Sequence, residues 1–324
     1  MLPLFLAAFV IGVALLAWGG NRFVVGSEAT AQNLNIPPII IGLTIAGFAT
    51  SAPELLISAL ASAAGNPGLA LGNAVGSNIA NIGLVLGLAA LVRPLTVHSK
   101  TTRMQLGMLL ITTVLVYMVF MDLRLSRVEG VVLLVSMVPL TTLLVWLILR
   151  SEQPSPVRVN TGADTPNGIG MFKATIQLTV GLGAMLAGAK CLVYGAEALA
   201  RAIGVNDLVI GLTMVAIGTS LPELAVAIAA VLKQKYDLVM GNVIGSNIFN
   251  LLAVIGVAGT IAPHELEARI LTVDYPIMAG FTLAIFVLAH IFRKKQQFDR
   301  RVGSLLFSAF IAYHGYIAWK IFSA

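Results

Sequence analysis

The sequence predicts an all-α membrane protein with ten transmembrane helices, arranged as two five-helix repeats of inverted topology. Three observations predict this fold class: the composition, the spacing of the apolar runs and an internal repeat. Of the 324 residues, 58% are hydrophobic and only 10% are charged, whereas soluble domains are about 25% charged. The mean hydropathy is +0.94. We therefore expect a multi-pass protein of the cell membrane, surrounded mainly by the lipid bilayer.

Apolar runs of roughly 20 residues, the length that crosses a bilayer, recur along the chain. One long polar stretch, 151–170, contains several Pro and Gly residues that favour turns, and we interpret it as a cytoplasmic linker between the halves 1–150 and 171–324. The predicted spans lie near 3–31, 36–64, 68–92, 103–121, 127–149, 171–202, 206–231, 237–261, 269–292 and 301–322.

An internal repeat relates the two halves at an offset of 169 residues. The segment GLTIAGFATSAPE at 42–54 matches GLTMVAIGTSLPE at 211–223, and GNAVGSNIAN at 72–81 matches GNVIGSNIFN at 241–250. We delimit the two copies as 42–95 and 211–264. Because five spans separate equivalent points, the second copy enters the membrane from the other side. Such a pseudo-twofold axis in the membrane plane is typical of secondary transporters.

The net charge of +6 is explained by topology, so we expect no nucleic-acid partner. With the amino terminus outside, 13 basic residues fall in cytoplasmic loops and 5 on the other side. Basic residues collect in cytoplasmic loops, so this asymmetry predicts that both termini lie on the non-cytoplasmic side.

Two glutamates, Glu54 and Glu223, occupy equivalent positions inside otherwise uncharged apolar spans. A charged side chain at the bilayer centre costs at least about 2.5–3.5 kcal/mol on insertion scales, so both are candidates for a functional site. An interhelical hydrogen-bond anchor is the structural alternative. Symmetric positions with matching neighbours favour the functional interpretation.

Hydroxyl groups lie beside each glutamate, and on a helix they share its face. Pro53 and Pro222 lack an N–H and crowd the preceding turn, so we expect each helix to kink there and release backbone oxygens. The hydroxyl residues are Thr50 and Ser51 in the first copy and Thr219 and Ser220 in the second.

The second limb of each copy carries a polar stripe at i, i+4 and i+8, flanked by Asn78 or Asn247. Neighbouring GxxxG pairs, such as Gly72 and Gly76 or Gly241 and Gly245, also predict close helix packing. We expect the glycines to pack and the stripes to line the site. The stripes are Asn73, Ser77 and Asn81, and Asn242, Ser246 and Asn250.

Carboxylate, hydroxyl, amide and carbonyl oxygens are hard ligands that suit calcium or sodium. Zinc, copper and iron are disfavoured because the spans contain no Cys or His cluster. We expect no resident cofactor.

These motifs, ATSAPE and GNAVGSNIANI with GTSLPE and GNVIGSNIFNL, resemble the paired alpha repeats of the calcium/cation antiporter superfamily, closest to its prokaryotic sodium/calcium exchanger branch. The resemblance implies exchange of calcium for sodium by alternating access in a bacterial inner membrane, with the long helices around 3–31 and 171–202 sliding against a core. It implies that Glu54 and Glu223 bind both ions. It further assigns sodium sites to Thr50, Ser51, Ser77, Thr219, Ser220 and Ser246, and the middle of the site to Asn81 and Asn250.

One departure from the superfamily pattern concerns the counter-ion. Many members carry Asp at one middle position, whereas Asn81 and Asn250 are both neutral here. Calcium/proton exchange is therefore the alternative to calcium/sodium exchange.

Two other classes of function fit these motifs less well. An enzyme is not expected, because an intramembrane hydrolase would need paired Asp residues or an HExxH motif in the spans. A passive cation channel would need rings or filters of ligands along a continuous pore. A single pair of acids favours a carrier. Glu28 and Glu197 lie near span ends and have either a helix-terminal role or a role in ion entry.

Overall fold

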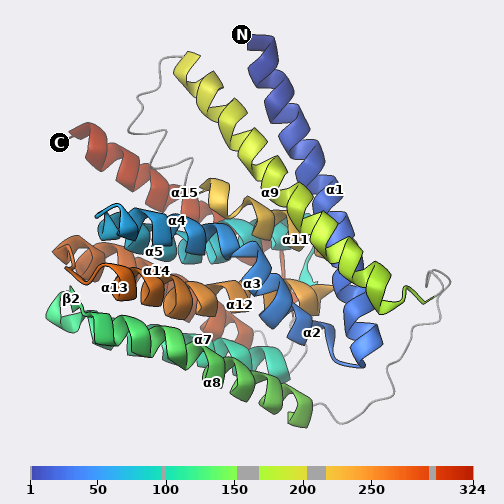
Figure 1. Ribbon diagram of the computed structural model, residues 1–324. Helices are drawn as coiled ribbons and strands as arrows, with labels where there is room; N and C mark the ends of the chain where they lie inside the picture. The colour runs from blue at the N-terminus through green and yellow to red at the C-terminus, as the bar shows by residue number, and fades with distance from the viewer. Residues whose placement is uncertain (1, 97–99, 152–167, 203–216, 292–296, 324) are drawn as a thin grey trace.

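The apolar runs of the sequence form helices in the computed structural model, which describes residues 2–96, 100–151, 168–202, 217–291 and 297–323 (Figure 1). The linker predicted at 151–170 lies mostly outside these residues, as do 203–216, with which the seventh predicted span and the second repeat copy begin. The first half contains α1 (Leu2–Leu34), α2 (Pro38–Ile41), η1 (Gly42–Ala46), α3 (Gly47–Thr50), α4 (Ala52–Ala63), α5 (Pro67–Ala80), η2 (Asn81–Leu86), α6 (Gly87–Val92), α7 (Lys100–Val119), η3 (Phe120–Asp122) and α8 (Arg127–Ser151).

The second half repeats this order of helices. Its described elements are α9 (Met171–Ala202), α11 (Leu221–Leu232), α12 (Tyr236–Phe249), η4 (Asn250–Val254), α13 (Ile255–Ile261), η5 (Ile270–Asp274), α14 (Tyr275–Ile291) and α15 (Arg300–Ser323).

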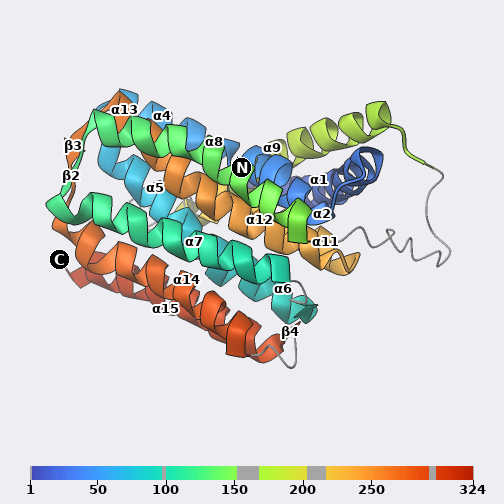
Figure 2. The ribbon, with the colours of Figure 1, turned by 90° about the horizontal axis from the view of Figure 1, so that it is seen from below.

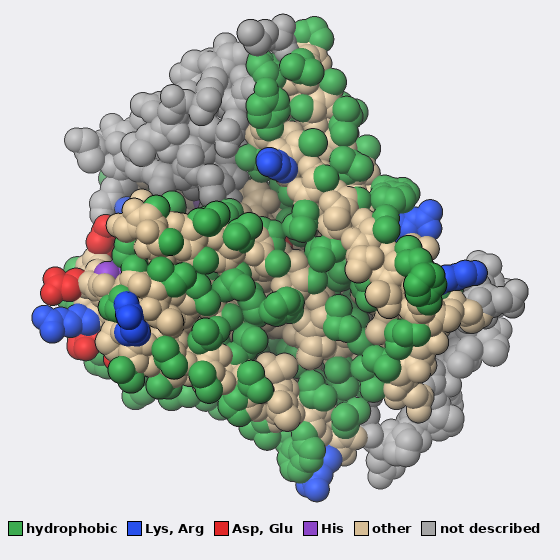
Figure 3. All heavy atoms as spheres, in the orientation of Figure 1, with side chains coloured by type: hydrophobic (Ala, Val, Ile, Leu, Met, Phe, Trp, Pro, Cys, Tyr) green, Lys and Arg blue, Asp and Glu red, His purple; other side chains and the backbone are tan. Residues whose placement is uncertain are grey.

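Eight helical segments of the described chain are long and apolar enough to cross a membrane. Hydrophobic side chains cover most of the face in Figure 3, and the charged side chains gather toward its edges. These observations confirm the predicted class of all-α, multi-pass membrane protein. The eight segments are Pro3–Leu34, Pro38–Ala63, Pro67–Val92, Thr101–Asp122, Arg127–Ser151, Met171–Ala196, Tyr236–Ile261 and Ile270–His290.

The long helices α1 and α9 lie side by side (Figures 1 and 2), and α1 also packs against α11. A Cβ built on Gly12 would meet the nitrogen of Leu192 at 2.5 Å, and one built on Gly26 would meet the nitrogen of Leu178 at 2.7 Å. Because the partner number falls as the α1 number rises, the two helices are antiparallel. Glycine is required at these crossings, since any side chain would separate the backbones.

The four central helices show the repeat in their backbone. α4 and α11 begin and end 169 residues apart, and so do α5 and α12. Each helix pair is joined by a turn with one left-handed residue, Gly65 at φ 79° and Gln234 at φ 60°. Among the eight apolar segments, Pro67–Val92 and Tyr236–Ile261 are the most buried. In the most apolar window of Tyr236–Ile261, every residue is buried.

Two short antiparallel sheets tie loops together at opposite ends of the helices (Figure 2). β1 (Leu95–Thr96) pairs with β4 (Gln297–Phe298), and β2 (Arg124–Leu125) pairs with β3 (His264–Glu265). The first sheet joins two loops predicted to be cytoplasmic, and the second joins two predicted to be on the other side. The structure thus groups these loops as the predicted topology requires.

Candidate ion-binding site

Both helices that carry the glutamates are interrupted beside them, as Pro53 and Pro222 predict. α3 ends at Thr50, Ser51 leaves the helix at φ −86° and ψ 5°, and α4 begins at Ala52. Ser220 has φ −85° and ψ 4°, and α11 follows it. The predicted kinks are therefore confirmed in both halves, with nearly identical backbone angles.

The breaks place Glu54 in the first turn of α4 and Glu223 in the first turn of α11. Backbone N–H groups at a helix N-terminus are unpaired and carry partial positive charge, which favours a carboxylate there. Neither side chain is exposed. Sequence reasoning did not foresee that the proline would start a new helix at each acid.

Hydroxyl groups from both halves surround the two carboxylates. Ser51 donates a hydrogen bond to Oε1 of Glu223 at 3.1 Å. Thr50 and Ser246 also neighbour Glu223, whereas Thr219 and Ser77 neighbour Glu54. Thr219 is equivalent to Thr50, and Ser77 to Ser246. The two acids therefore match in these neighbours, whereas Ser220, the equivalent of Ser51, has no hydrogen-bond partner among the described residues.

The hydroxyl of Thr50 connects the first half to α12. It lies 3.3 Å from Oδ1 of Asn242 and 3.4 Å from Oγ of Ser246, and it also donates to the carbonyl of Ala46. Ser246 in turn donates to the carbonyl of Gly47 at 3.4 Å. The predicted stripe residues of α12 thus face the helix break of the other half.

Four asparagines form two equivalent hydrogen-bonded pairs between the halves, and each pair includes the first residue of one of the π-helical segments η2 and η4. Nδ2 of Asn81 donates to Oδ1 of Asn247 at 3.0 Å, and Nδ2 of Asn250 donates to Oδ1 of Asn78 at 3.1 Å. The side-chain oxygens Oδ1 of Asn81 and Asn250 are buried without a hydrogen-bond partner in the described chain. The flanking asparagines hold the amide groups, so that both oxygens stay free for a ligand.

All ten predicted site residues are buried, with side chains at most 6% exposed. Several of their oxygen atoms have no hydrogen-bond partner among the described residues, although buried polar atoms are normally paired. Leaving a carboxylate unpaired in a dry interior is costly, and a bound cation would remove that cost. These atoms are Oε1 and Oε2 of Glu54, Oε2 of Glu223, Oγ of Ser77 and Ser220, and Oδ1 of Asn81 and Asn250.

The donor set suits a hard cation. Its oxygens come from two carboxylates, several hydroxyls and two amides, which is the ligand chemistry of calcium. Two carboxylates also balance one divalent ion. In the described chain, no three His, Cys, Asp or Glu side chains come together in a group that could hold a metal ion.

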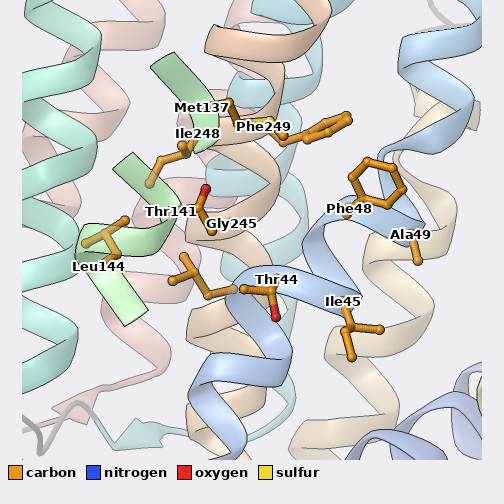
Figure 4. A pocket seen from close by; sticks show the side chains of 11 residues that line it. Thr44, Ile45, Phe48, Ala49, Met137, Thr141, Leu144, Gly245, Ile248 and Phe249 are labelled. Atoms are coloured by element: carbon orange, nitrogen blue, oxygen red, sulfur yellow. The ribbon is translucent and has the colours of Figure 1, made fainter. Parts of the chain in front are cut away.

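A separate cavity of about 400 Å³ lies beside the site, between η1, α3, α8 and α12 (Figure 4). Thr44 and Thr141 supply the only hydroxyls of its lining, which otherwise consists of side chains such as Ile45, Phe48 and Met137 together with Gly245. Because it offers no charged ligand, this cavity is not a site for a cation.

The membrane helices and the buried acidic pair indicate a membrane transport protein. The family model described as "Sodium/calcium exchanger protein" matches residues 4–146 and 173–319. The chain therefore belongs to the sodium/calcium exchanger family, and it is a cation antiporter. This membership confirms the resemblance to the calcium/cation antiporter superfamily.

Relatives of similar length support the same assignment. The protein named "Putative antiporter CaxA" of Alkalimonas amylolytica is 42% identical over 304 residues, covering 94% of this chain and 95% of that protein. Sodium/calcium exchanger MaX1 of Methanosarcina acetivorans is 27% identical, covering 95% and 97%. The solved structure of the sodium-calcium exchanger NCX_Mj soaked with zero Na+ and Ca2+ matches with a TM-score of 0.83 and 33% identity, covering 98% and 100%.

Proposed function

We propose that the protein exchanges calcium for sodium by alternating access, and that both ions compete for one site at Glu54 and Glu223. The observation that carries this proposal is the cluster of buried, unpaired oxygens contributed by both halves. Relatives named sodium/calcium exchangers add support. Proton exchange is the alternative, because the two acids could take up protons instead of sodium.

Ten transmembrane helices in two inverted repeats are the architecture that we propose around this site. The antiparallel α1 and α9, the matching α4 and α11, and the two groups of loops support it. α15 and the 12-residue α11 stand outside the eight segments that are long and apolar enough to span. In this architecture α15 is the tenth span, and α11 belongs to the span predicted from the sequence at 206–231. Both termini and the loop between α4 and α5 then face the non-cytoplasmic side of an inner membrane.

The linker at 151–170 separates the two halves, so we assign 1–150 to the first half and 171–324 to the second. The ligands proposed for calcium and sodium are the two glutamates together with Thr50, Ser51, Ser77, Thr219, Ser220, Ser246, Asn81 and Asn250.

Ion-flux measurements in proteoliposomes test the function. We expect calcium uptake to require an outward sodium gradient and to persist when proton gradients are collapsed with an ionophore. Uptake driven only by a proton gradient would replace sodium by protons as the counter-ion. Uptake without any counter-ion would indicate a channel and would contradict the proposal.

A further inference from the structure

A second polar stripe leads away from the candidate site along α4. Glu54, Ser58 and Ser62 follow one another at i, i+4 and i+8, so they lie on one face of this helix. Their side chains are 0%, 0% and 2% exposed. At 1.5 Å of rise per residue, the stripe extends about 12 Å from the carboxylate to the last turn of the helix.

Asn73 on α5 lines the opposite side of this stripe. Its Nδ2 donates to Oγ of Ser58 at 3.0 Å and to the backbone carbonyl of Glu54 at 3.1 Å. Its Oδ1 has no hydrogen-bond partner in the described residues, and neither has Oγ of Ser62. Two buried polar oxygens, one on α5 and one near the end of α4, are therefore unsatisfied, which calls for water or a cation beside them.

The second half serves as an internal control, because its helices α11 and α12 begin and end at the positions equivalent to those of α4 and α5. Ala227 and Val231 occupy the positions of Ser58 and Ser62, and both are completely buried. Oδ1 of Asn242, the residue equivalent to Asn73, accepts a hydrogen bond from the hydroxyl of Thr50. Its Nδ2 has no partner in the described chain. The face of α11 beyond Glu223 is thus apolar where that of α4 is polar.

The two helix turns at the outer ends of these faces also differ. The α4–α5 turn consists of Ala64, Gly65 and Asn66, which are exposed and uncharged. The α11–α12 turn contains Lys233 and Lys235, and Lys235 forms an ion pair with Glu28 of α1. Fixed positive charge opposes the approach of a cation, so the α4–α5 turn is the more favourable entrance.

We propose that the Ser58–Asn73–Ser62 track is a hydrated entry path that binds a monovalent cation such as sodium on its way to Glu54. The track offers only neutral oxygens, and without a carboxylate it lacks the charge that a divalent ion needs when it is dehydrated. The proposal rests on the proposed function of the site at Glu54. Its test with silver ions, however, gives a result whether or not calcium is transported.

Silver accessibility of introduced cysteines compares the two halves directly. Silver is a monovalent cation that binds thiolates, and Cys191 is the only native cysteine. In a Cys191→Ala background we would place single cysteines on the track, Ser58→Cys and Ser62→Cys, and on the equivalent apolar face, Ala227→Cys and Val231→Cys. The protein would be held in nanodiscs, where both membrane faces meet the buffer.

After silver treatment the protein is denatured, and the free thiols are measured with a fluorescent maleimide. We expect the thiols on the track to be blocked at least about tenfold faster than those on the apolar face, because a cation enters an apolar interior only at a high cost. Equal rates at all four positions, or no reaction on the track, would overturn the entry path. The site at Glu54 would not be affected by that result.

Transport by the double variant Ser58→Ala/Ser62→Val provides a second measurement, which copies the residues of α11 into α4. We expect the sodium concentration for half-maximal exchange to rise several-fold, while calcium binding is retained. Ser136→Ala is the matched control, because among the described residues this hydroxyl donates only to the carbonyl of Leu133 in its own helix α8. An unchanged sodium dependence in the double variant would count against the track even if the cysteine variants failed to fold.

Discussion

The two halves of the molecule share a backbone but differ in the side chains that surround it. Around Glu54 and Glu223 the helix breaks, the asparagine pairs and most of the hydroxyl neighbours match. One helical turn after the glutamates the halves differ, because the position of Ser58 in the first half is occupied by Ala227 in the second. The symmetric part is the candidate site, which the two membrane sides would reach in turn under the proposed alternating access. The asymmetric part lies on the way to it, where the two sides present different ion concentrations.

Loss of either glutamate is expected to have the largest effect, and the same effect in both halves. Glu54→Gln and Glu223→Gln each remove one of the two charges that balance calcium. Leaving a buried charge uncompensated costs about 3–5 kcal/mol, which is at least about a hundredfold in affinity. We expect calcium flux in proteoliposomes to fall to background in both variants, with normal membrane insertion. Near-normal flux in one of them would break the equivalence of the halves.

The α1–α9 interface offers a test with a control in the same helix. A Cβ on Gly181 would meet the nitrogen of Phe23 at 2.6 Å, whereas one on Gly183 would meet nothing within 4 Å in the described chain. We expect Gly181→Ala to lower stability by about 1–3 kcal/mol. Gly183→Ala should leave stability unchanged or raise it slightly, since Ala favours a helix. Thermal unfolding in detergent measures both, and equal melting temperatures would contradict this packing.

The neutral middle of the site gives a smaller, conditional effect. Asn250→Asp adds a third acid next to Glu54 and Glu223, which should attract cations but also bind a proton more readily. We expect calcium flux in this variant to be more strongly inhibited as the pH falls. Asn81→Asp should behave in the same way if the halves are equivalent here. Curves of uptake against pH and sodium that superimpose on the wild type would remove position 250 from the site.

The ion pair between Glu28 and Lys235 is expected to have the smallest effect. Both side chains are partly exposed, at 28% and 37%, and such pairs contribute about 0–1 kcal/mol. We expect Glu28→Gln and Lys235→Gln to change thermal stability by less than about 1 kcal/mol each, with a coupling visible in the double variant. Lys233→Gln removes a charge from an exposed residue of the same turn and serves as the uncoupled control.

Much of the fold and of the site was predictable, because the repeat constrains both halves at once. Pro53 and Pro222 predict the helix breaks, and the stripes predict which faces meet. The packing predicted for Gly241 is confirmed, because a Cβ built on this residue would lie 2.5 Å from the carbonyl oxygen of Ile39. For Gly72, no described residue lies within 4 Å of an added Cβ. The close helix packing predicted for Gly72 is therefore not found among the described residues.

Other features could not be predicted from a single sequence. The π-helical segments that begin at Asn81 and Asn250 depend on how the helices pack, and helical periodicity alone does not reveal them. The pairing of Asn78 with Asn250 requires knowing which faces of α5 and α12 touch. Ser58 and Ser62 could have been found, because their spacing continues the stripe from Glu54. They were missed because the repeat comparison emphasises what the halves share.

Calcium binding by the purified protein tests the central claim most directly, because it asks whether the two halves build one site or two. Titration calorimetry would be carried out without sodium on the wild type, Glu54→Gln, Glu223→Gln and the double variant. One shared site predicts that each wild-type molecule binds one calcium ion at this site and that either single substitution abolishes this binding. If each single variant kept half of the wild-type binding, the glutamates would form independent sites, and the account of a shared site would be wrong.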